Sequence, residues 1–444
     1  YEQVKKMNYR DTMKINAAGH LEIGGCDCVE LVRQYGTPLY VMDEEYVRSV
    51  CRAFKQTIEK TYGSGNMAYA SKAFSCKAIY NVMKQEKTFI DVVSGGEIYT
   101  AASVGFDMSG AFFHGNNKTD VELELAMRTG VGTIVIDAAD DAERIDALAR
   151  RFERVQNVLV RVNPGVEAHT HSYIQTAKVD SKFGFSVSSG AATAAIKDVL
   201  SRKNLHFSGL HCHIGSQIFV RSAFALAVDV MTDYMRELAG EGIEVETLNM
   251  GGGFGVHYTE EDPKYNVDEY CDYVSLLTRT LCECVERKNL KKPFFVIEPG
   301  RAVVGEAGVT LYSVGAVKDI PGVRKYVAVD GGMTDNIRPA LYEAKYEAVL
   351  ANRANDKAKE KVSIAGKCCE SGDIIIKDIC LPEAKRGDLI AVFTTGAYCY
   401  SMASNYNRNA VPPVVFVRGG KSGYAVKPQT YEDIARLDAI PQTE

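Results

Sequence analysis

Three short segments contain residue types that could hold a charged cofactor. Lys72 ends an apolar stretch, MAYASKAF at 67–74, that otherwise reads as a buried strand. Lysine is rarely buried without a partner, so a strand that reaches the surface is the simplest explanation for it. GGGFG at 251–255 offers backbone N–H groups that can bind an anion, and EPGR at 298–301 adds a carboxylate and a guanidinium. If the fold brings these segments together, they could hold a phosphate group beside an amine.

The elements that would position these segments are strands that alternate with helices between about 66 and 302. Short apolar runs are separated by longer segments with helical periodicity, which is typical of successive strand–helix units. Eight such strands predict a closed (β/α)8 barrel rather than an open, doubly wound sheet. The predicted strands are 68–73, 89–94, 108–115, 132–138, 157–163, 206–214, 245–252 and 294–300.

Active sites in such barrels lie at the C-terminal ends of the strands, and phosphate often binds after the seventh and eighth strands. GGGFG and EPGR follow those two strands, and Lys72 ends the first. A lysine and a phosphate site at one barrel mouth predict pyridoxal phosphate, bound covalently to Lys72. The other polar strand ends are Ser94, His114, Asp137, Asn163, His211 and His213.

Glu298 acquires a role in this arrangement. A carboxylate against the pyridine nitrogen would keep that nitrogen protonated and strengthen the ring as an electron sink. The alternative is an ion pair between Glu298 and Arg301 or a neighbouring lysine. His213 could lie against the face of the ring.

The sequence changes character after about 303, where strands are separated by glycine, proline and aspartate. We expect a separate β domain at 303–444, which residues 1–45 join, and a barrel at 46–302. KYEAVLANRANDKAKEKVS, at 345–363, reads as a polar surface loop.

Composition excludes several classes of function. The net charge of −5 and the absence of basic runs argue against nucleic acid as a partner. No apolar stretch approaches the roughly 20 residues that span a bilayer, and no secretory signal precedes the first strand. The chain is expected to be cytoplasmic. It begins with Tyr1 rather than methionine, so the removal of an N-terminal leader is an open alternative. The 12 cysteines are expected to be reduced thiols.

HCH, at residues 211–213, is a candidate metal site. On a strand, His211 and His213 would project from the same face, as two zinc ligands could. No third ligand is spaced with them, and the cysteines form no paired C-x-x-C motifs. No metal is expected.

Nine motifs in order carry a family resemblance over most of the chain from 69 to 409. The chain resembles the fold-type III, alanine-racemase-like pyridoxal-phosphate enzymes, and within them the diaminopimelate decarboxylases. The motifs are YASKA, DVVSGGE, GNNKT, HCHIGSQ, GGGFG, EPGR, DGGMTDNIRPALY, CCESGD and GAYCYSMASNYN.

The resemblance implies a cofactor site and a reaction, the decarboxylation of meso-2,6-diaminopimelate to L-lysine, the last step of lysine biosynthesis. Lys72 would hold the cofactor, His213 would stack on its ring and Glu298 would contact the pyridine nitrogen. The residues implied at the phosphate are Ser216, Gly253, Gly300 and Arg301.

The resemblance also implies a substrate site that is shared between the subunits of a homodimer, with CCESGD supplied by the partner. Cys369 would donate the proton that replaces carbon dioxide, although Cys368 is adjacent to it. Glu370 would face the distal amine, and Tyr398 would contact both cofactor and substrate. Arginine suits a planar carboxylate through paired hydrogen bonds; the residues implied for carboxylate binding are Arg301, Arg338 and Tyr342.

Three alternatives remain. A sister decarboxylase for ornithine, arginine, lysine or carboxynorspermidine would give Arg338 no distal carboxylate to bind. A racemase would favour arginine over Glu298 at the pyridine nitrogen. A non-catalytic regulatory relative would have no need to retain Lys72, Glu298 and Cys369.

Overall fold

The computed structural model describes residues 10–166 and 182–442. These residues form two compact units. The barrel unit comprises Arg48–Val256 and Tyr265–Val303. The β unit comprises the chain up to Val47, the segment His257–Lys264, and the chain from Val304 onward. The segment His257–Lys264 lies within the range predicted for the barrel, yet it groups with the β unit.

The barrel unit contains a closed parallel sheet, which confirms the predicted (β/α)8 architecture. Among the described residues, eight parallel strands follow one another around it, and the pairing of β8 with β9 closes the circle. In order around the barrel, the strands are β5 (Gly65–Ala70), β6 (Phe89–Val92), β7 (Ala111–Phe113), β8 (Thr133–Ile136), β9 (Gln156–Asn163), β11 (Leu205–His211), β12 (Thr247–Asn249) and β13 (Phe294–Ile297).

A shared core explains why these segments form strands. Side chains from five of the strands pack together as one buried cluster, formed by Ala68, Phe112, Val135, Leu159 and Val296. Strands buried on both faces require continuous apolar runs, which is the pattern seen in the sequence. The polar residues are therefore displaced to the strand ends.

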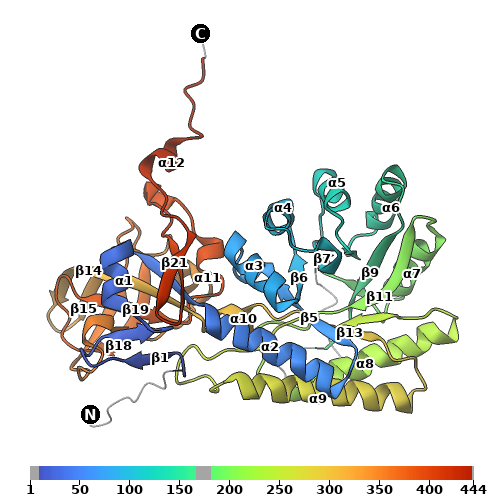
Figure 1. The fold of residues 1–444 in the computed structure, drawn as a ribbon, viewed down its shortest axis with the longest axis horizontal. Helices are drawn as coiled ribbons and strands as arrows, with labels where there is room; N and C mark the ends of the chain where they lie inside the picture. Colours follow the sequence, from blue (N-terminus) through green and yellow to red (C-terminus); the bar gives the residue numbers. More distant parts are fainter. Residues whose placement is uncertain (1–9, 167–181, 443–444) are drawn as a thin grey trace. The chain divides into compact units, whose positions relative to one another are not determined.

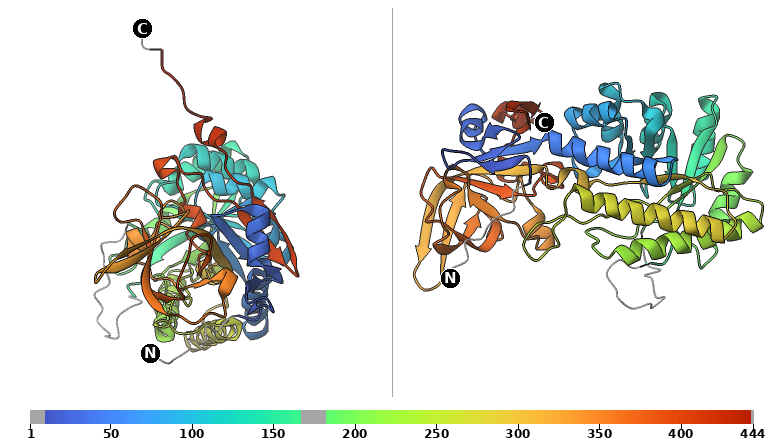
Figure 2. Two further views of the ribbon diagram at one scale, coloured as in Figure 1. Left: turned by 90° about the vertical axis from the view of Figure 1, so that its left-hand side faces the viewer. Right: turned by 60° about the horizontal axis from the view of Figure 1, so that its bottom comes forward.

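Helices cover the outside of the barrel. Figure 1 shows them following their strands in sequence order: α3 (Lys77–Glu86), α4 (Gly95–Ser103), α5 (Asp120–Thr129), α6 (Asp141–Arg151) and α7 (Ala191–Ser201). The barrel part of α2 (Glu44–Thr61) runs beside α9 (Val267–Arg287), as Figure 2 shows, and the hydroxyls of Thr61 and Thr278 are 2.7 Å apart. Helix α8 (Arg221–Gly240) packs beside α9.

The β unit is built on a second sheet. Its strands run in the order β18 (Ile374–Leu381), β17 (Glu360–Ala365), β15 (Arg324–Val329), β14 (Gly308–Ile320), β4 (Leu39–Asp43), β20 (Val414–Arg418) and β21 (Lys421–Val426). Strand β4, near the N-terminus, thus lies between β14 and β20. Strand β14 also pairs with β19 (Leu389–Phe393).

Lys72 and the stretch at 345–363 differ from the expected local structure. Strand β5 ends at Ala70, and Lys72 lies in the following 3-10 turn, Ser71–Ala73. The hydroxyl of Tyr69 donates to the carbonyl of Phe74 at 2.8 Å and closes this turn. The stretch at 345–363 is not all loop, because it contains β16 (Ala348–Leu350), whose buried residues pair with β19.

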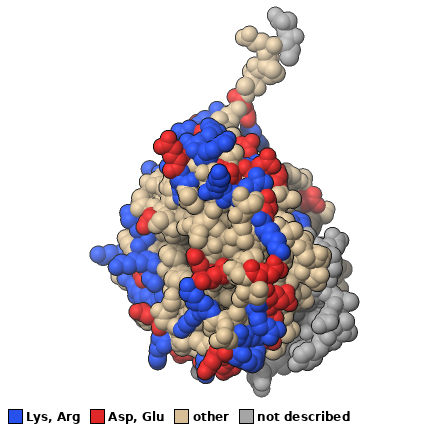
Figure 3. Space-filling view, turned by 90° about the vertical axis from the view of Figure 1, so that its right-hand side faces the viewer, with Lys and Arg blue, Asp and Glu red and all other residues tan. Residues whose placement is uncertain are grey.

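The surface agrees with the charge balance of the sequence. On the face drawn in Figure 3, basic and acidic side chains are interspersed, and neither sign forms a continuous patch. Within the described ranges, no helix combines the length and the apolar character needed to cross a membrane.

Candidate active site

The motifs predicted to meet at the barrel mouth are joined by backbone hydrogen bonds. The amide of Ala70, two residues before Lys72, donates to the carbonyl of Pro299 in EPGR at 3.2 Å. The amide of Glu298 donates in turn to the carbonyl of Gly251 at 2.7 Å. Lys72, EPGR and GGGFG therefore occupy neighbouring positions on one rim, with the Lys72 side chain exposed.

Glycines allow these loops to approach so closely. A Cβ atom on Gly252 would lie 2.1 Å from the carbonyl oxygen of Glu298. A Cβ on Gly253, whose φ of +104° already favours glycine, would lie 2.3 Å from the carbonyl oxygen of Gly215. At Gly300 it would lie 2.9 Å from a methyl group at the end of β5. The loops thus form a cradle of bare backbone.

HCHIGSQ borders the same cradle. Nδ1 of His213 accepts a hydrogen bond from the amide of Gly252 at 3.2 Å. Burial and the charges of Lys72 and Arg161 lower the pKa of His213 to about 3, so its imidazole is neutral and carries its proton on Nε2. The guanidinium of Arg301 donates to the hydroxyl of Ser216 at 3.1 Å. The sequence predictions for this part of the rim therefore come together in space.

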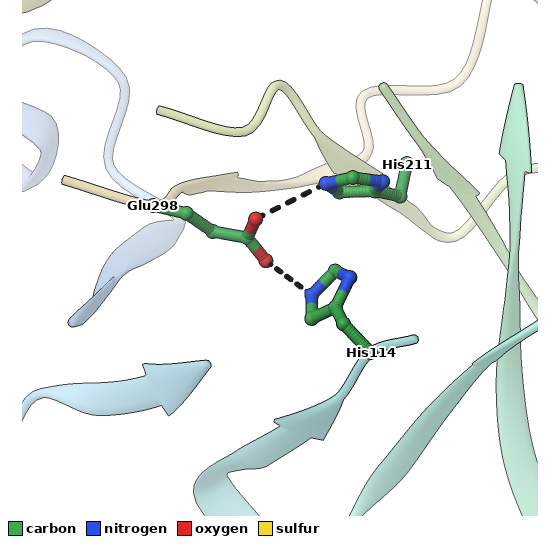
Figure 4. Close-up of side chains that lie close together, drawn as sticks. All are labelled: His114, His211 and Glu298. Carbon is green, nitrogen blue, oxygen red and sulfur yellow. Dashed lines mark hydrogen bonds and ion pairs between the residues drawn. The ribbon is translucent and has the colours of Figure 1, made fainter. Parts of the chain in front are cut away.

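Glu298 lies at the centre of a buried polar cluster, shown in Figure 4. Its Oε1 accepts from Nε2 of His114 at 2.8 Å and from Nδ2 of Asn249 at 2.6 Å. Its Oε2 accepts from Nε2 of His211 at 3.1 Å. The alternative reading of Glu298, an ion pair with Arg301 or a lysine, is wrong for the described residues.

The environment sets the charges in this cluster. Burial alone would raise the pKa of Glu298, but His114 and His211 hold it well below its usual value, so the carboxylate is ionised. Burial lowers the pKa of His211 to about 4, which leaves it neutral. Burial raises the pKa of the neighbouring Asp91 carboxyl. One ionised carboxylate thus sits under the rim with three donors.

The two histidines of HCH do not act as a pair. His211 lies with His114 and Glu298, and the side-chain nitrogen and oxygen atoms of these three residues are within 4.8 Å of one another. His213 instead faces the glycine cradle. In the described structure the histidine nitrogens of this group donate to Glu298.

In the β unit, Arg338 is a buried cation between tyrosines. It begins α11 (Arg338–Tyr342), and its Nη1 donates to the hydroxyl of Tyr258 at 3.0 Å and to that of Tyr346. Tyr258 belongs to the segment His257–Lys264, so this hydrogen bond is one of the contacts that join the segment to the rest of the β unit. Tyr342, at the end of the same short helix, is 61% exposed.

The loop CCESGD is organised by its last residue. The carboxylate of Asp373 accepts from the amides of Met333, in DGGMTDNIRPALY, and Cys368, each at 2.7 Å. Cys369 and Glu370 are exposed, and the amide of Cys369 donates to Oδ1 of Asn407 at 2.8 Å. Two motifs from distant parts of the sequence are thereby held together.

Tyr398 is half-buried and has a positive φ of 64°. A bulky residue in this left-handed region is uncommon and usually marks a turn or a functional constraint.

Sequence reasoning missed the partners of Glu298. His114 was identified only as a polar strand end, and Asn249 was not identified at all. A signal was present for His114, which ends the apolar run AFF, whereas Asn249 follows the mixed segment VETL and gave no such signal. Asp373 was likewise included in a motif without a role of its own.

The chain is similar to known proteins along nearly its whole length. Residues 47–305 match the family "Pyridoxal-dependent decarboxylase, pyridoxal binding domain". The chain is 49% identical over 428 residues to the diaminopimelate decarboxylase of Bacillus subtilis, covering 96% of this chain and 97% of that protein. It is 42% identical over 427 residues to that of Mycobacterium tuberculosis, covering 94% of each.

A solved structure agrees. The crystal structure of diaminopimelate decarboxylase from M. jannaschii in complex with L-lysine matches with a TM-score of 0.89 and 35% identity, covering 97% of this chain and 98% of that one. The chain therefore belongs to the pyridoxal-phosphate-dependent decarboxylases and, within them, to the diaminopimelate decarboxylase family.

Proposed function

We propose that the protein converts meso-2,6-diaminopimelate to L-lysine and carbon dioxide with the help of pyridoxal phosphate. The observation that carries the proposal is the barrel rim, where the exposed amine of Lys72, the glycine cradle and the buried Glu298 carboxylate lie on adjoining loops. Similarity to diaminopimelate decarboxylases along nearly the whole chain supports the choice of substrate.

The residues of the rim fit this cofactor. The close approach of the loops at Gly252 and Gly253 brings backbone to this rim, and the amide of Gly253 suits a phosphate group. An ionised Glu298 suits a protonated pyridine nitrogen. Bound pyridoxal phosphate supplies an electron sink that stabilises the carbanion left when carbon dioxide departs.

These positions support the proposed cofactor contacts. Lys72 would provide the amine for covalent attachment, and neutral His213 would provide a flat surface for the ring. Glu298 would keep the pyridine nitrogen protonated. The remaining proposed cofactor-binding residues are Ser216, Gly253, Gly300, Arg301 and Tyr398.

The distal end of the substrate has an ammonium group and a carboxylate. Its recognition is therefore assigned to both acidic and basic residues. Arg338 is supported by its two tyrosine partners, which fix the guanidinium for bidentate binding of a carboxylate. Glu370 is exposed and suits the ammonium group. Arg301, Tyr342 and Tyr398 are the other proposed substrate contacts.

Cys369 is proposed as the proton donor at the carbon that loses carbon dioxide. Its neighbour Cys368 is buried, and burial raises the pKa of that thiol, which favours Cys369 as the donor. Cys369 is exposed, and its backbone is fixed by Asn407. We further propose that the protein is a homodimer in which this loop completes the partner's site.

Carbon dioxide release tests the proposed function. Purified protein with added pyridoxal phosphate should release carbon dioxide from meso-diaminopimelate, and much less from ornithine, arginine or lysine. Lys72→Ala should abolish both the turnover and the visible absorbance of the covalently bound cofactor. Turnover confined to the monocarboxylate substrates would replace this substrate with that of a sister decarboxylase.

A further inference from the structure

Glu298 accepts more hydrogen bonds than a simple ion pair would provide. A carboxylate offers about four acceptor positions, two on each oxygen. His114 and Asn249 occupy the positions on Oε1, and His211 occupies one on Oε2. One acceptor position, on Oε2, is left for a further donor.

The three donors hold the carboxylate from different parts of the barrel. Asn249 and His211 end β12 and β11, strands close to β13, which precedes Glu298. His114 follows β7, which lies three strands away from β13 in the other direction. Figure 4 shows the two imidazoles reaching different oxygens of Glu298. The carboxylate cannot rotate without breaking a hydrogen bond to one side or the other.

The two histidines donate in different charge states. His211 is neutral, and its Nδ1 has no hydrogen-bond partner among the described residues, which places its proton on Nε2. Burial lowers the pKa of His114, but Glu298 and Asp91, whose Oδ1 is 3.9 Å from Nε2, raise it above its ordinary value. His114 therefore holds a positive charge more readily than a free imidazole, whereas His211 supplies only a hydrogen bond. Arg161 is the other cation that acts on both.

We propose that His114, His211 and Asn249 are positioning residues, which keep Glu298 ionised and aim its remaining Oε2 acceptor position at the pyridine nitrogen. This inference rests on the proposed function, because the assignment requires pyridoxal phosphate at Lys72. The cluster then determines how strongly the ring is protonated, and through it the rate of the chemical step rather than the binding of substrate.

The protonation state of the pyridine nitrogen can be measured directly. Protein reconstituted with pyridoxal phosphate that is ¹⁵N-labelled in the ring gives a nitrogen chemical shift that distinguishes a protonated from an unprotonated pyridine. His114→Leu and His211→Leu should both move this shift toward the unprotonated value. For His114→Leu, kcat should fall about tenfold or more, the effect of losing a charge-assisted hydrogen bond, while KM stays within about twofold.

Glutamine variants separate charge from hydrogen bonding. The amide nitrogen of glutamine can replace Nε2 as a neutral donor. His211→Gln should therefore restore the parent shift, whereas His114→Gln should restore only part of it. These variants also decide the question if a leucine variant fails to fold.

His206→Gln is the matched control. His206 lies on the same strand β11 and pairs with Glu246 at 2.9 Å, but both side chains are exposed, so the shift should not move. An unchanged shift in the His114 and His211 variants, with Lys72 modified by the cofactor as judged by mass, would overturn the inference. Absence of modification in the parent protein would instead refute the proposed function.

Discussion

At the scale of single residues, Asp373 shows how one carboxylate can fix a loop. Its two oxygens accept from the amides of Met333 and Cys368. Cβ atoms on Gly332 and Gly366 would lie 2.5 and 2.2 Å from this carboxylate, so both turns are folded tightly around it. The loop that presents Cys369 depends on these contacts.

We predict that Asp373→Asn weakens both folding and catalysis. The amide keeps the shape but offers one oxygen in place of two, so one buried N–H loses its acceptor at a cost of about 1–3 kcal/mol. Urea unfolding would measure that loss, and kcat should fall because Cys369 is displaced. Asp356→Asn, in an exposed pair with Arg353, is the control and should change neither quantity. If Asp373→Asn is destabilised but its kcat is unaltered, the contacts of Asp373 do not position Cys369.

Glu86 predicts a pH dependence of stability. Burial alone would raise its pKa, but hydrogen bonds from Arg52 and Arg48, at 2.8 and 2.7 Å to Oε1, lower it below the usual value. A lowered pKa stabilises the fold above the ordinary carboxyl pKa, and this contribution is lost as the pH falls through the folded-state pKa.

Glu86→Gln should therefore be less stable than the parent near pH 7 by about 1–3 kcal/mol, and the difference should shrink near pH 3. Guanidinium unfolding at the two pH values measures it. Glu30→Gln, which breaks an exposed pair with Arg33, should show no such trend. A difference that stays constant with pH would mean that the ionised carboxylate is not the source of the stability.

The residues of the site were predictable by type and position, but their contacts were not. Lys72 and Glu298 stand out because charged residues end apolar runs. The partnership of Glu298 with His114 and Asn249 depends on which strands face each other across the barrel, and a single sequence does not contain that register.

At the scale of elements, short continuous apolar runs predicted the barrel strands because each strand must bury both faces. The same signal failed where turns compete with strands. Met108–Gly110 was assigned to a strand but forms a 3-10 turn, capped by the Asp107 side chain, which accepts from the amide of Ser109. Strand β16 was missed because only three apolar residues interrupt a polar stretch.

Helix α5 offers an element-scale prediction. Thr119 and Glu122 form a reciprocal capping box, in which the hydroxyl of Thr119 accepts from the amide of Glu122. Thr119→Ala should lower the free energy of unfolding by about 1 kcal/mol, because the amide of Glu122 loses its acceptor. Thr430→Ala removes the same motif from α12 (Tyr431–Ala435), a short helix without buried residues, and should leave the unfolding transition in place. Equal effects of the two substitutions would contradict this account.

At the scale of the whole molecule, each unit supplies part of the proposed chemistry. Lys72 and Glu298 belong to the barrel unit, whereas Arg338, Cys369 and Tyr398 belong to the β unit. A homodimer with shared sites predicts that Lys72→Ala and Cys369→Ala, each inactive alone, regain some activity when they are mixed and exchange subunits.

Random exchange should make half of the dimers mixed, and one of the two sites in each mixed dimer is intact. The mixture should therefore regain up to about one quarter of the parent activity. Size-exclusion chromatography and mass spectrometry of differently labelled subunits would confirm the exchange. Mixing Lys72→Ala with itself after the same treatment is the control. Exchange without any regained activity would place Lys72 and Cys369 of a site on the same subunit.

Strand β14 has a consequence for the β unit as a whole. Its first half pairs with β4 and β19, and its second half pairs with β15, so one continuous segment contributes to three strand pairs. The first half is buried, whereas residues 315–319 in the second half are exposed. A substitution in the buried half should therefore weaken the pairing with β4 and β19 together, whereas opening of the exposed half would loosen only the pairing with β15.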